Sequence, residues 1–174
     1  MSFIVKHTHR IDPGKKYTTN RESCRGIVIS DGKILLSHEI IGDLYLIPGG
    51  GLEKNEDPEE CCEREIEEET GYVVRPVEHY LDLYHYFDYK PERQLNHYYI
   101  CEVVKKSEQK LTIYEKKVKL TPEWKTTEEA YKLFANYKNV RNEEKRKLYH
   151  REFLALKAYF DKKGIAVPED QVSR

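Results

Sequence analysis

The sequence predicts an α/β fold, in which a mixed β-sheet is combined with helices. Three observations indicate it: β-rich runs separated by turn residues, one strongly capped helix between such runs, and two amphipathic helices near the C-terminus. The chain has 174 residues, which is enough to bury one core. It contains no repeat or low-complexity linker, so residues 1–174 are expected to form a single domain.

The clearest strand signals lie in the first half of the chain. The β-rich runs 24–30 and 33–38 flank Asp31-Gly32, a dipeptide that favours a two-residue hairpin turn. A short strand is expected at 44–47, where Pro48 and three glycines end it. Further strands are expected at 3–7, 72–77, 79–87 and 95–104. The Lys-rich region 105–124 shows no assignable pattern.

A helix over 58–70 is marked at both ends. Asp57 is suited to the N-cap, Pro58 to the first helical position, and Glu60 to the third position of a capping box. Gly71 is suited to the left-handed conformation that follows a helix.

Two C-terminal helices are expected, at about 127–137 and 142–163. Thr127 is the expected cap of the first helix and Asn142 of the second, which Gly164 ends. Apolar residues recur at helical spacing in both, and these stripes predict core packing. The stripes are Ala130, Leu133, Phe134 and Tyr137 in the first helix, and Tyr149, Phe153, Leu156 and Phe160 in the second.

Composition excludes several classes of protein. Lys and Arg number 30 against 31 Asp and Glu, which argues against a globally basic nucleic-acid coat. No apolar run approaches the ~20 residues of a transmembrane helix, and the N-terminus lacks the apolar stretch of a signal peptide. We therefore expect a cytoplasmic protein without membrane contact. Its cysteines are expected to be reduced and mostly buried: Cys24, Cys61, Cys62 and Cys101.

The near-neutral total hides a local imbalance of charge. Residues 50–72 contain ten acidic and two basic residues, a net charge of −8, whereas the rest of the chain carries +7. On a helical wheel Glu65, Glu68 and Glu69 fall within roughly 100° of one another. They lie beside the face expected to be buried, which is formed by Cys62, Ile66 and Thr70.

Such a concentration of carboxylates suggests a cation. Like charges three or four residues apart destabilise a helix by a few tenths of a kcal/mol each, roughly. Mg²⁺ or Mn²⁺ would offset that repulsion, because both prefer carboxylate oxygens and water. From the helix alone, a solvated acidic surface without metal is an equally good interpretation.

The segment 50–72 resembles the signature of the Nudix hydrolases, in which a Gly, a Glu, an Arg-Glu pair, a Glu-Glu pair and a Gly stand at fixed spacing. Eight positions match in register: Gly50, Glu56, Arg64, Glu65, Ile66, Glu68, Glu69 and Gly71. The resemblance implies an α/β/α sandwich around a mixed sheet, with the signature forming a loop–helix–loop that binds Mg²⁺. It also implies hydrolysis of a diphosphate linkage in a nucleoside diphosphate derivative by water attack on phosphorus.

The resemblance assigns roles within the signature. Glu65, Glu68 and Glu69 correspond to the metal-binding carboxylates, and Arg64 to a catalytic-site residue that orients them. Glu56, Gly50 and Gly71 are supporting residues. Glu68 or Glu65 would act as the general base, and in some relatives a Glu from a later loop does so. Two residues are available for that alternative: Glu115 and Glu123.

Residues outside the signature give hypotheses about the substrate. Tyr80, Asp82, Tyr84, Tyr86 and Asp88 share one face of an alternating strand, where Tyr84 and Tyr86 could stack on a nucleobase. The same face could instead be a dimer surface or a second packed face.

Basic and imidazole side chains extend these hypotheses. Arg25 could reach a substrate phosphate, and the position where relatives often carry such an Arg holds Ser37-His38. Three histidines lack metal-ligand spacing and are expected to be ordinary hydrogen-bonded side chains: His79, His85 and His97.

The leading hypothesis is a Mg²⁺-dependent pyrophosphohydrolase acting on a small nucleotide-type substrate. Hydrolysis at the 5′ end of RNA is an alternative, but the basic stretch 138–163 is better explained as a solvated helix face than as a nucleic-acid contact. A nucleotide-sensing binding module without catalysis is a third interpretation. A homodimer is compatible with all three.

Overall fold

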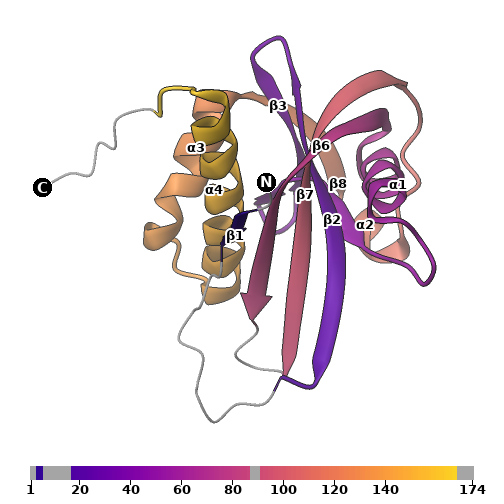
Figure 1. The fold of residues 1–174 in the computed structure, drawn as a ribbon, viewed down its shortest axis with the longest axis horizontal. Helices are drawn as coiled ribbons and strands as arrows, with labels where there is room; N and C mark the ends of the chain where they lie inside the picture. The colour runs from indigo at the N-terminus through magenta and orange to yellow at the C-terminus, as the bar shows by residue number, and fades with distance from the viewer. Residues whose placement is uncertain (1–2, 6–16, 87–90, 168–174) are drawn as a thin grey trace, which may run out of the picture.

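The computed structural model describes residues 3–5, 17–86 and 91–167 (Figure 1). One mixed sheet has the strand order β1-β6-β7-β2-β3-β4, with β5 paired to β2 and β8 paired to β3. The strands are β1 (Phe3–Val5), β2 (Thr19–Ser30), β3 (Lys33–Glu39), β4 (Leu44–Leu46), β5 (Gly49–Gly51), β6 (Tyr72–Tyr86), β7 (Glu92–Lys106) and β8 (Leu120–Thr126). The helices are α1 (Pro58–Thr70), α2 (Ile113–Lys117), α3 (Thr127–Ala135), the 3₁₀ helix η1 (Asn136–Asn139) and α4 (Glu143–Lys163).

The sheet lies between two helical layers, which confirms the predicted α/β fold and sandwich arrangement (Figure 1). On one face α1 packs through a cluster that includes Cys62, Ile66 and Cys101. On the other face α3 and α4 cover the larger core, with Phe134, Leu156 and other residues against the sheet. Side chains of β2 contribute to the packing on both faces of the sheet, and its residues 23–28 are all buried.

The predicted hairpin and signature helix are confirmed. Asp31 and Gly32 have φ angles of 49° and 72°, the left-handed pair that a tight hairpin turn between β2 and β3 requires. α1 covers Pro58–Thr70, begins with the Asp57–Glu60 capping box, and is followed by Gly71 at a φ of 71°. The spacing of the capping residues in the sequence therefore predicted both ends of this helix correctly.

Other boundaries differ from the expectation. The expected strands 72–77 and 79–87 form one bent strand, β6, as far as the described residues extend. The unassigned region 105–124 contains α2 and most of β8. The cap of α3 is Thr126 rather than Thr127, because only Thr126 has a Glu at the third position of the helix to complete a capping box.

A bulge in β6 overturns the predicted position of Tyr80. The pairing with β7 shifts between His79 and Leu81, so Tyr80 is the extra residue and the alternation of faces breaks there. Tyr80 is buried against α4, where its hydroxyl donates to the Ala155 carbonyl oxygen at 2.9 Å. It therefore does not share a face with Asp82, and Asp88 lies outside the described residues.

The four cysteines are free and buried, as expected. Across the described ranges, no helix combines the length and apolarity needed to cross a bilayer.

Candidate active site

Arg64 organises the acidic face of α1. Its Nε and Nη2 atoms donate to the two oxygens of Glu56 at 2.6 and 2.9 Å, which forms a bidentate pair. Nη1 donates to Glu65 at 2.8 Å and to Glu68 at 3.4 Å, and Nη2 also reaches the Gly51 carbonyl oxygen. The guanidinium lowers the pKa of Glu56 to about 2, so Glu56 is a permanent anion at neutral pH.

Glu69 projects from the same helix into a desolvated position against the sheet. Its Oε2 atom accepts from the Ser37 hydroxyl at 2.7 Å and from the Gly49 amide at 3.2 Å. Burial raises the pKa of Glu69 to about 7, although these hydrogen bonds and the positive charge of Arg25 oppose the shift. Glu69 is thus an oriented carboxylate whose charge is costly unless a cation compensates it.

The glycines of β5 allow the carboxylates to approach the backbone. A Cβ atom on Gly50 would collide with the Glu65 carboxylate, and one on Gly49 would collide with the backbone of Cys24 and Arg25. Gly49 also has a φ of 143°, a conformation that favours glycine. Of the two supporting glycines, Gly71 has the left-handed backbone expected of a turn residue, whereas Gly50 lies in strand β5 and matters for the space that it leaves beside Glu65.

The arrangement fits a hard divalent cation in its chemistry. Burial raises the pKa of Glu65, and the charge of Glu68 adds to that shift while Arg64 opposes it. Glu65 and Glu68 share one Arg64 nitrogen, whereas Glu69 is turned toward Ser37. Side-chain rotations would therefore be needed to gather all three around one ion. The donor set is composed of carboxylate oxygens, which Mg²⁺ and Mn²⁺ prefer.

The two candidates for the general base that lie outside the signature, Glu115 and Glu123, differ in their surroundings. Glu115 accepts from the Thr112 amide at 2.7 Å in the capping box of α2, and its charge adds to the raised pKa of Glu65. Glu123 pairs with Lys125 at 2.7 Å and contacts His38 and Tyr45. The Lys125 contact lowers the pKa of Glu123, which makes it a poorer base.

Arg25 is buried, with 8% of its surface exposed. Its Nε donates to Asn96 at 3.1 Å, and Nη1 donates to the carbonyl oxygens of Ile47 and Gly49 at 3.0 and 3.3 Å. These contacts describe a side chain that holds the turn leading into β5. A contact between Arg25 and a substrate phosphate stays a prediction.

Tyr84 and Tyr86 lie near the end of β6, with ring centroids 6.3 Å apart. They line a shallow pocket with residues of α4, among them Lys147, His150 and Arg151. No residue of α1 lines this pocket. The structure thus brings the two tyrosines together but places them in a group separate from the carboxylates.

Ser37 of β3 contributes to the acidic face, because its hydroxyl donates to Glu69. Glu39, two residues along the same strand, has its pKa raised by burial and by the charge of Glu115. Residue spacing could not indicate the contact between Ser37 and Glu69, because β3 meets α1 only through the tertiary fold.

Solved structures with this fold have low sequence identity to the chain. A NUDIX hydrolase from Nitrosomonas europaea has a TM-score of 0.63 and 20% identity over 90% of this chain and 97% of its own. The E. coli ORF135 protein has a TM-score of 0.61 and 18% identity over 87% and 96%. A UDP-X diphosphatase has a TM-score of 0.57 and 19% identity over 90% and 69%. These likenesses establish the fold.

A curated relative matches a shorter segment. YjhB of Bacillus subtilis (strain 168), named as a candidate ADP-ribose pyrophosphatase, is 39% identical over 62 residues. The match covers 36% of this chain and 30% of that protein. The model of the NUDIX domain matches residues 20–155, which include α1 with its capped ends, Arg64 and the three carboxylates of its acidic face, and the chain therefore belongs to the NUDIX family.

Proposed function

We propose that the protein hydrolyses the diphosphate linkage of a small nucleoside diphosphate derivative with the help of Mg²⁺. The observation that carries this proposal is the acidic face of α1, where Arg64 orients Glu56, Glu65 and Glu68 and the backbone of β5 orients Glu69. The names of two similar proteins, an ADP-ribose pyrophosphatase candidate and a UDP-X diphosphatase, point to the same substrate class.

Glu65, Glu68 and Glu69 would hold the cation. When bound, Mg²⁺ neutralises charge on the diphosphate oxygens and orients the attacking water. Arg64 keeps Glu65 and Glu68 on the same side of the helix, and its pair with Glu56 anchors the guanidinium itself. Ser37 and the Gly49 amide hold the Glu69 oxygen in place. The protein thus supplies an oriented set of carboxylates that would bind Mg²⁺, and the bound Mg²⁺ would in turn bind the anionic diphosphate of the substrate.

Glu68 is favoured over Glu65 as the general base that accepts the proton of the attacking water. The Glu68 side chain is 36% exposed and lies 3.4 Å from Arg64, whereas that of Glu65 is 16% exposed and lies 2.8 Å from it. The greater exposure of Glu68 leaves its carboxylate oxygens open to water, whereas the Glu65 carboxylate is held between Arg64 and the backbone of Gly50.

The test is hydrolysis of a panel comprising ADP-ribose, nucleotide sugars, dinucleoside polyphosphates and nucleoside triphosphates, with Mg²⁺ and with products identified. The variant Glu69→Gln is expected to lower turnover of the best substrate about a hundredfold or more, because a neutral amide loses the charge that attracts the cation. Glu63→Gln is the matched control, since Glu63 is an exposed residue of the same helix.

Three results would contradict the proposal. The first is near-normal turnover by folded Glu69→Gln. The second is tight nucleotide binding without turnover in Mg²⁺ or Mn²⁺, which would indicate a sensing module. The third is turnover confined to 5′-triphosphorylated or capped RNA, with binding that weakens steeply as salt rises.

A further inference from the structure

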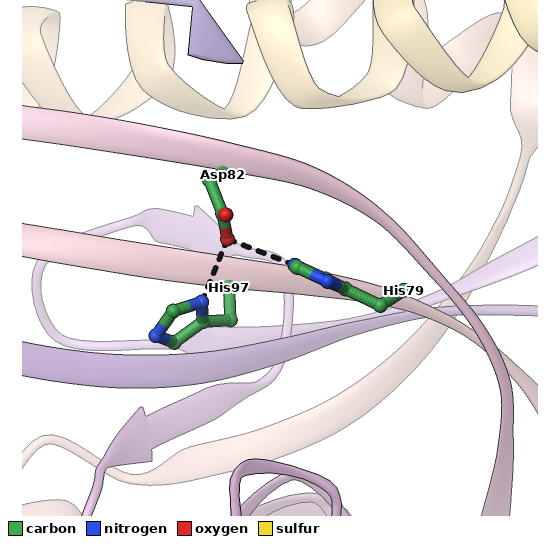
Figure 2. A group of neighbouring side chains, drawn as sticks. All are labelled: His79, Asp82 and His97. Atoms are coloured by element: carbon green, nitrogen blue, oxygen red, sulfur yellow. Dashed lines mark hydrogen bonds and ion pairs between the residues drawn. The ribbon is translucent and has the colours of Figure 1, made fainter. Parts of the chain in front are cut away.

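Two histidines and an aspartate converge on the sheet at a position separate from the acidic face of α1. His79 and Asp82 belong to β6 and His97 belongs to β7, and Figure 2 shows the three side chains directed toward one another. One ligand atom from each lies within 4.8 Å of the others. Their side chains are 32%, 20% and 13% exposed, so solvent reaches the group.

The bulge in β6 creates this group. Residues 79 and 82 are three apart, and strict alternation would place them on opposite faces of the strand. The extra residue Tyr80 shifts the register, so both side chains reach the same face. Asp82 is then paired directly with His97 across the ladder, which brings the third member within contact.

Both ring nitrogens of His97 face a carboxylate oxygen. Its Nδ1 atom lies 2.6 Å from Asp82 Oδ1, and its Nε2 atom lies 3.1 Å from Glu22 Oε2. A neutral imidazole has one N–H donor, and its other nitrogen is an acceptor that can also ligate a metal. The same Asp82 oxygen also lies 2.8 Å from His79 Nε2. Two carboxylates and two imidazoles therefore share one small volume.

We propose that His79, Asp82 and His97 form a Zn²⁺ site that is distinct from the proposed Mg²⁺ site. A metal bound at His97 Nδ1 takes the place of a proton there, and the proton on Nε2 then donates to Glu22. That arrangement, in which a ligating histidine donates its other N–H to a carboxylate, is the usual outer support of zinc ligands. Each ring nitrogen of His97 would then have a partner, the metal at Nδ1 and the Glu22 carboxylate at Nε2.

The types of ligand atom in this group indicate which metal ion the site would bind. Two imidazole nitrogens and one carboxylate oxygen suit Zn²⁺ and its neighbours in the transition series, whereas Mg²⁺ prefers oxygen ligands only. Ligand atoms around tetrahedral zinc stand roughly 3.3 Å apart, given bonds of about 2.0 Å. The present separations of 2.6 and 2.8 Å from the shared Asp82 oxygen would widen to that value on metal binding, which requires rotation of the side chains. Three protein ligands leave the fourth position to water.

The experiment measures Zn²⁺ affinity by competition with a chromophoric chelator, in the presence of a large excess of Mg²⁺ that occupies carboxylate-only sites. The wild-type chain is expected to bind one equivalent of Zn²⁺. His79→Gln and His97→Gln are each expected to weaken binding at least about tenfold. Glu22→Gln is expected to weaken it about tenfold, because an amide oxygen accepts the outer hydrogen bond less strongly than a carboxylate does. Co²⁺ bound in place of Zn²⁺ is expected to give visible absorption that both histidine variants lose.

Two controls separate the site from other effects. His150→Gln removes a histidine of α4 that stacks on Tyr137, and it is expected to leave Zn²⁺ binding unchanged. Glu69→Gln is expected to retain Zn²⁺ binding as well. The Zn²⁺ site is therefore tested independently of the proposed hydrolysis. Circular dichroism of each variant establishes that it is folded, and Asp82→Asn, which keeps the shape of the side chain, tests the third ligand if a histidine variant fails to fold.

Absence of a Zn²⁺ equivalent in the wild-type chain would overturn the proposal, as would wild-type affinity in folded His79→Gln and His97→Gln. Loss of binding in Glu69→Gln would also overturn it, since the metal would then belong to the acidic face of α1.

Discussion

At the scale of single residues, the acidic face of α1 depends on the guanidinium of Arg64 and on the absence of a side chain at Gly50. Arg64 contacts Glu56, Glu65 and Glu68, so a single guanidinium compensates three of the ten acidic residues in the signature segment. Gly50 leaves the space that the Glu65 carboxylate occupies. The positions of the carboxylates therefore depend on residues that would not themselves touch the substrate.

The substitution Gly50→Ala tests the space beside Glu65. The new methyl group would displace the Glu65 carboxylate, so turnover is expected to fall about tenfold or more while the chain stays folded, because small misplacements of catalytic groups are costly. The control is Gly42→Ala, where a Cβ atom meets only ordinary contacts at 3.8 and 4.0 Å. Equal activities of the two variants in a Mg²⁺-dependent assay would refute the steric role of Gly50.

The pair between Arg64 and Glu56 predicts a specific dependence of stability on pH. The pKa of Glu56 is lowered from 4.5 to about 2 in the folded chain, so the unfolded chain binds a proton first as the pH falls. This contribution to the free energy of unfolding is fully present above pH 4.5 and is lost progressively down to about pH 2. Glu56→Gln is expected to flatten that part of the stability curve.

Urea unfolding of the wild-type chain and Glu56→Gln between pH 2.5 and 6 would measure this effect. Glu53→Gln is the comparison, because Glu53 is an exposed residue of the same loop. Parallel curves for the wild-type chain and Glu56→Gln would show that the pair does not link folding to protonation.

At the scale of elements, the caps and stripes of the helices were predictable, whereas the polar core of α4 was not. In the predicted stripe of α4, Tyr149, Leu156 and Phe160 are buried as expected, and Phe153 is partly buried against the same core. Arg151 and Glu152 are buried beside it as an ion pair, and the Tyr98 hydroxyl of β7 donates to Glu152 at 3.2 Å. A charged residue in a helix sequence indicates an exposed position by default, and the solvated face expected for the basic stretch 138–163 does not extend to these two residues.

Removing one partner of this ion pair is expected to destabilise the fold strongly. Glu152→Ala leaves the buried Arg151 guanidinium without its carboxylate, and a loss of about 3–5 kcal/mol in the free energy of unfolding is expected. Glu144→Ala, an exposed change in the same helix, is expected to cost less than about 1 kcal/mol. Denaturant titration of both variants measures the difference, and equal stabilities would contradict the structural role of the pair.

At the scale of the whole molecule, the sheet connects three groups of polar residues that the chain keeps far apart in sequence. α1 and β3 form the acidic face, the end of β6 and α4 form the tyrosine-lined pocket, and β6 and β7 form the histidine–aspartate cluster. In the first group, the carboxylates and Arg64 lie within the continuous signature 50–72, whereas Ser37 of β3 lies outside it. The other two arise where strands and helices from different parts of the chain pack together (Figures 1 and 2).

Local chemistry explains what the sequence by itself determined: the α/β class, the Asp31-Gly32 turn, the bounds of α1, and the side of that helix on which Glu65, Glu68 and Glu69 lie. Caps, turn residues and helical periodicity act over a few residues, so they can be recognised without the fold. The tertiary structure alone decided that Ser37 meets Glu69, that Arg25 is buried, that Tyr80 leaves its expected face, and that His79 meets Asp82. Those outcomes depend on strand register and on one bulge, which arise from packing between segments distant in the sequence.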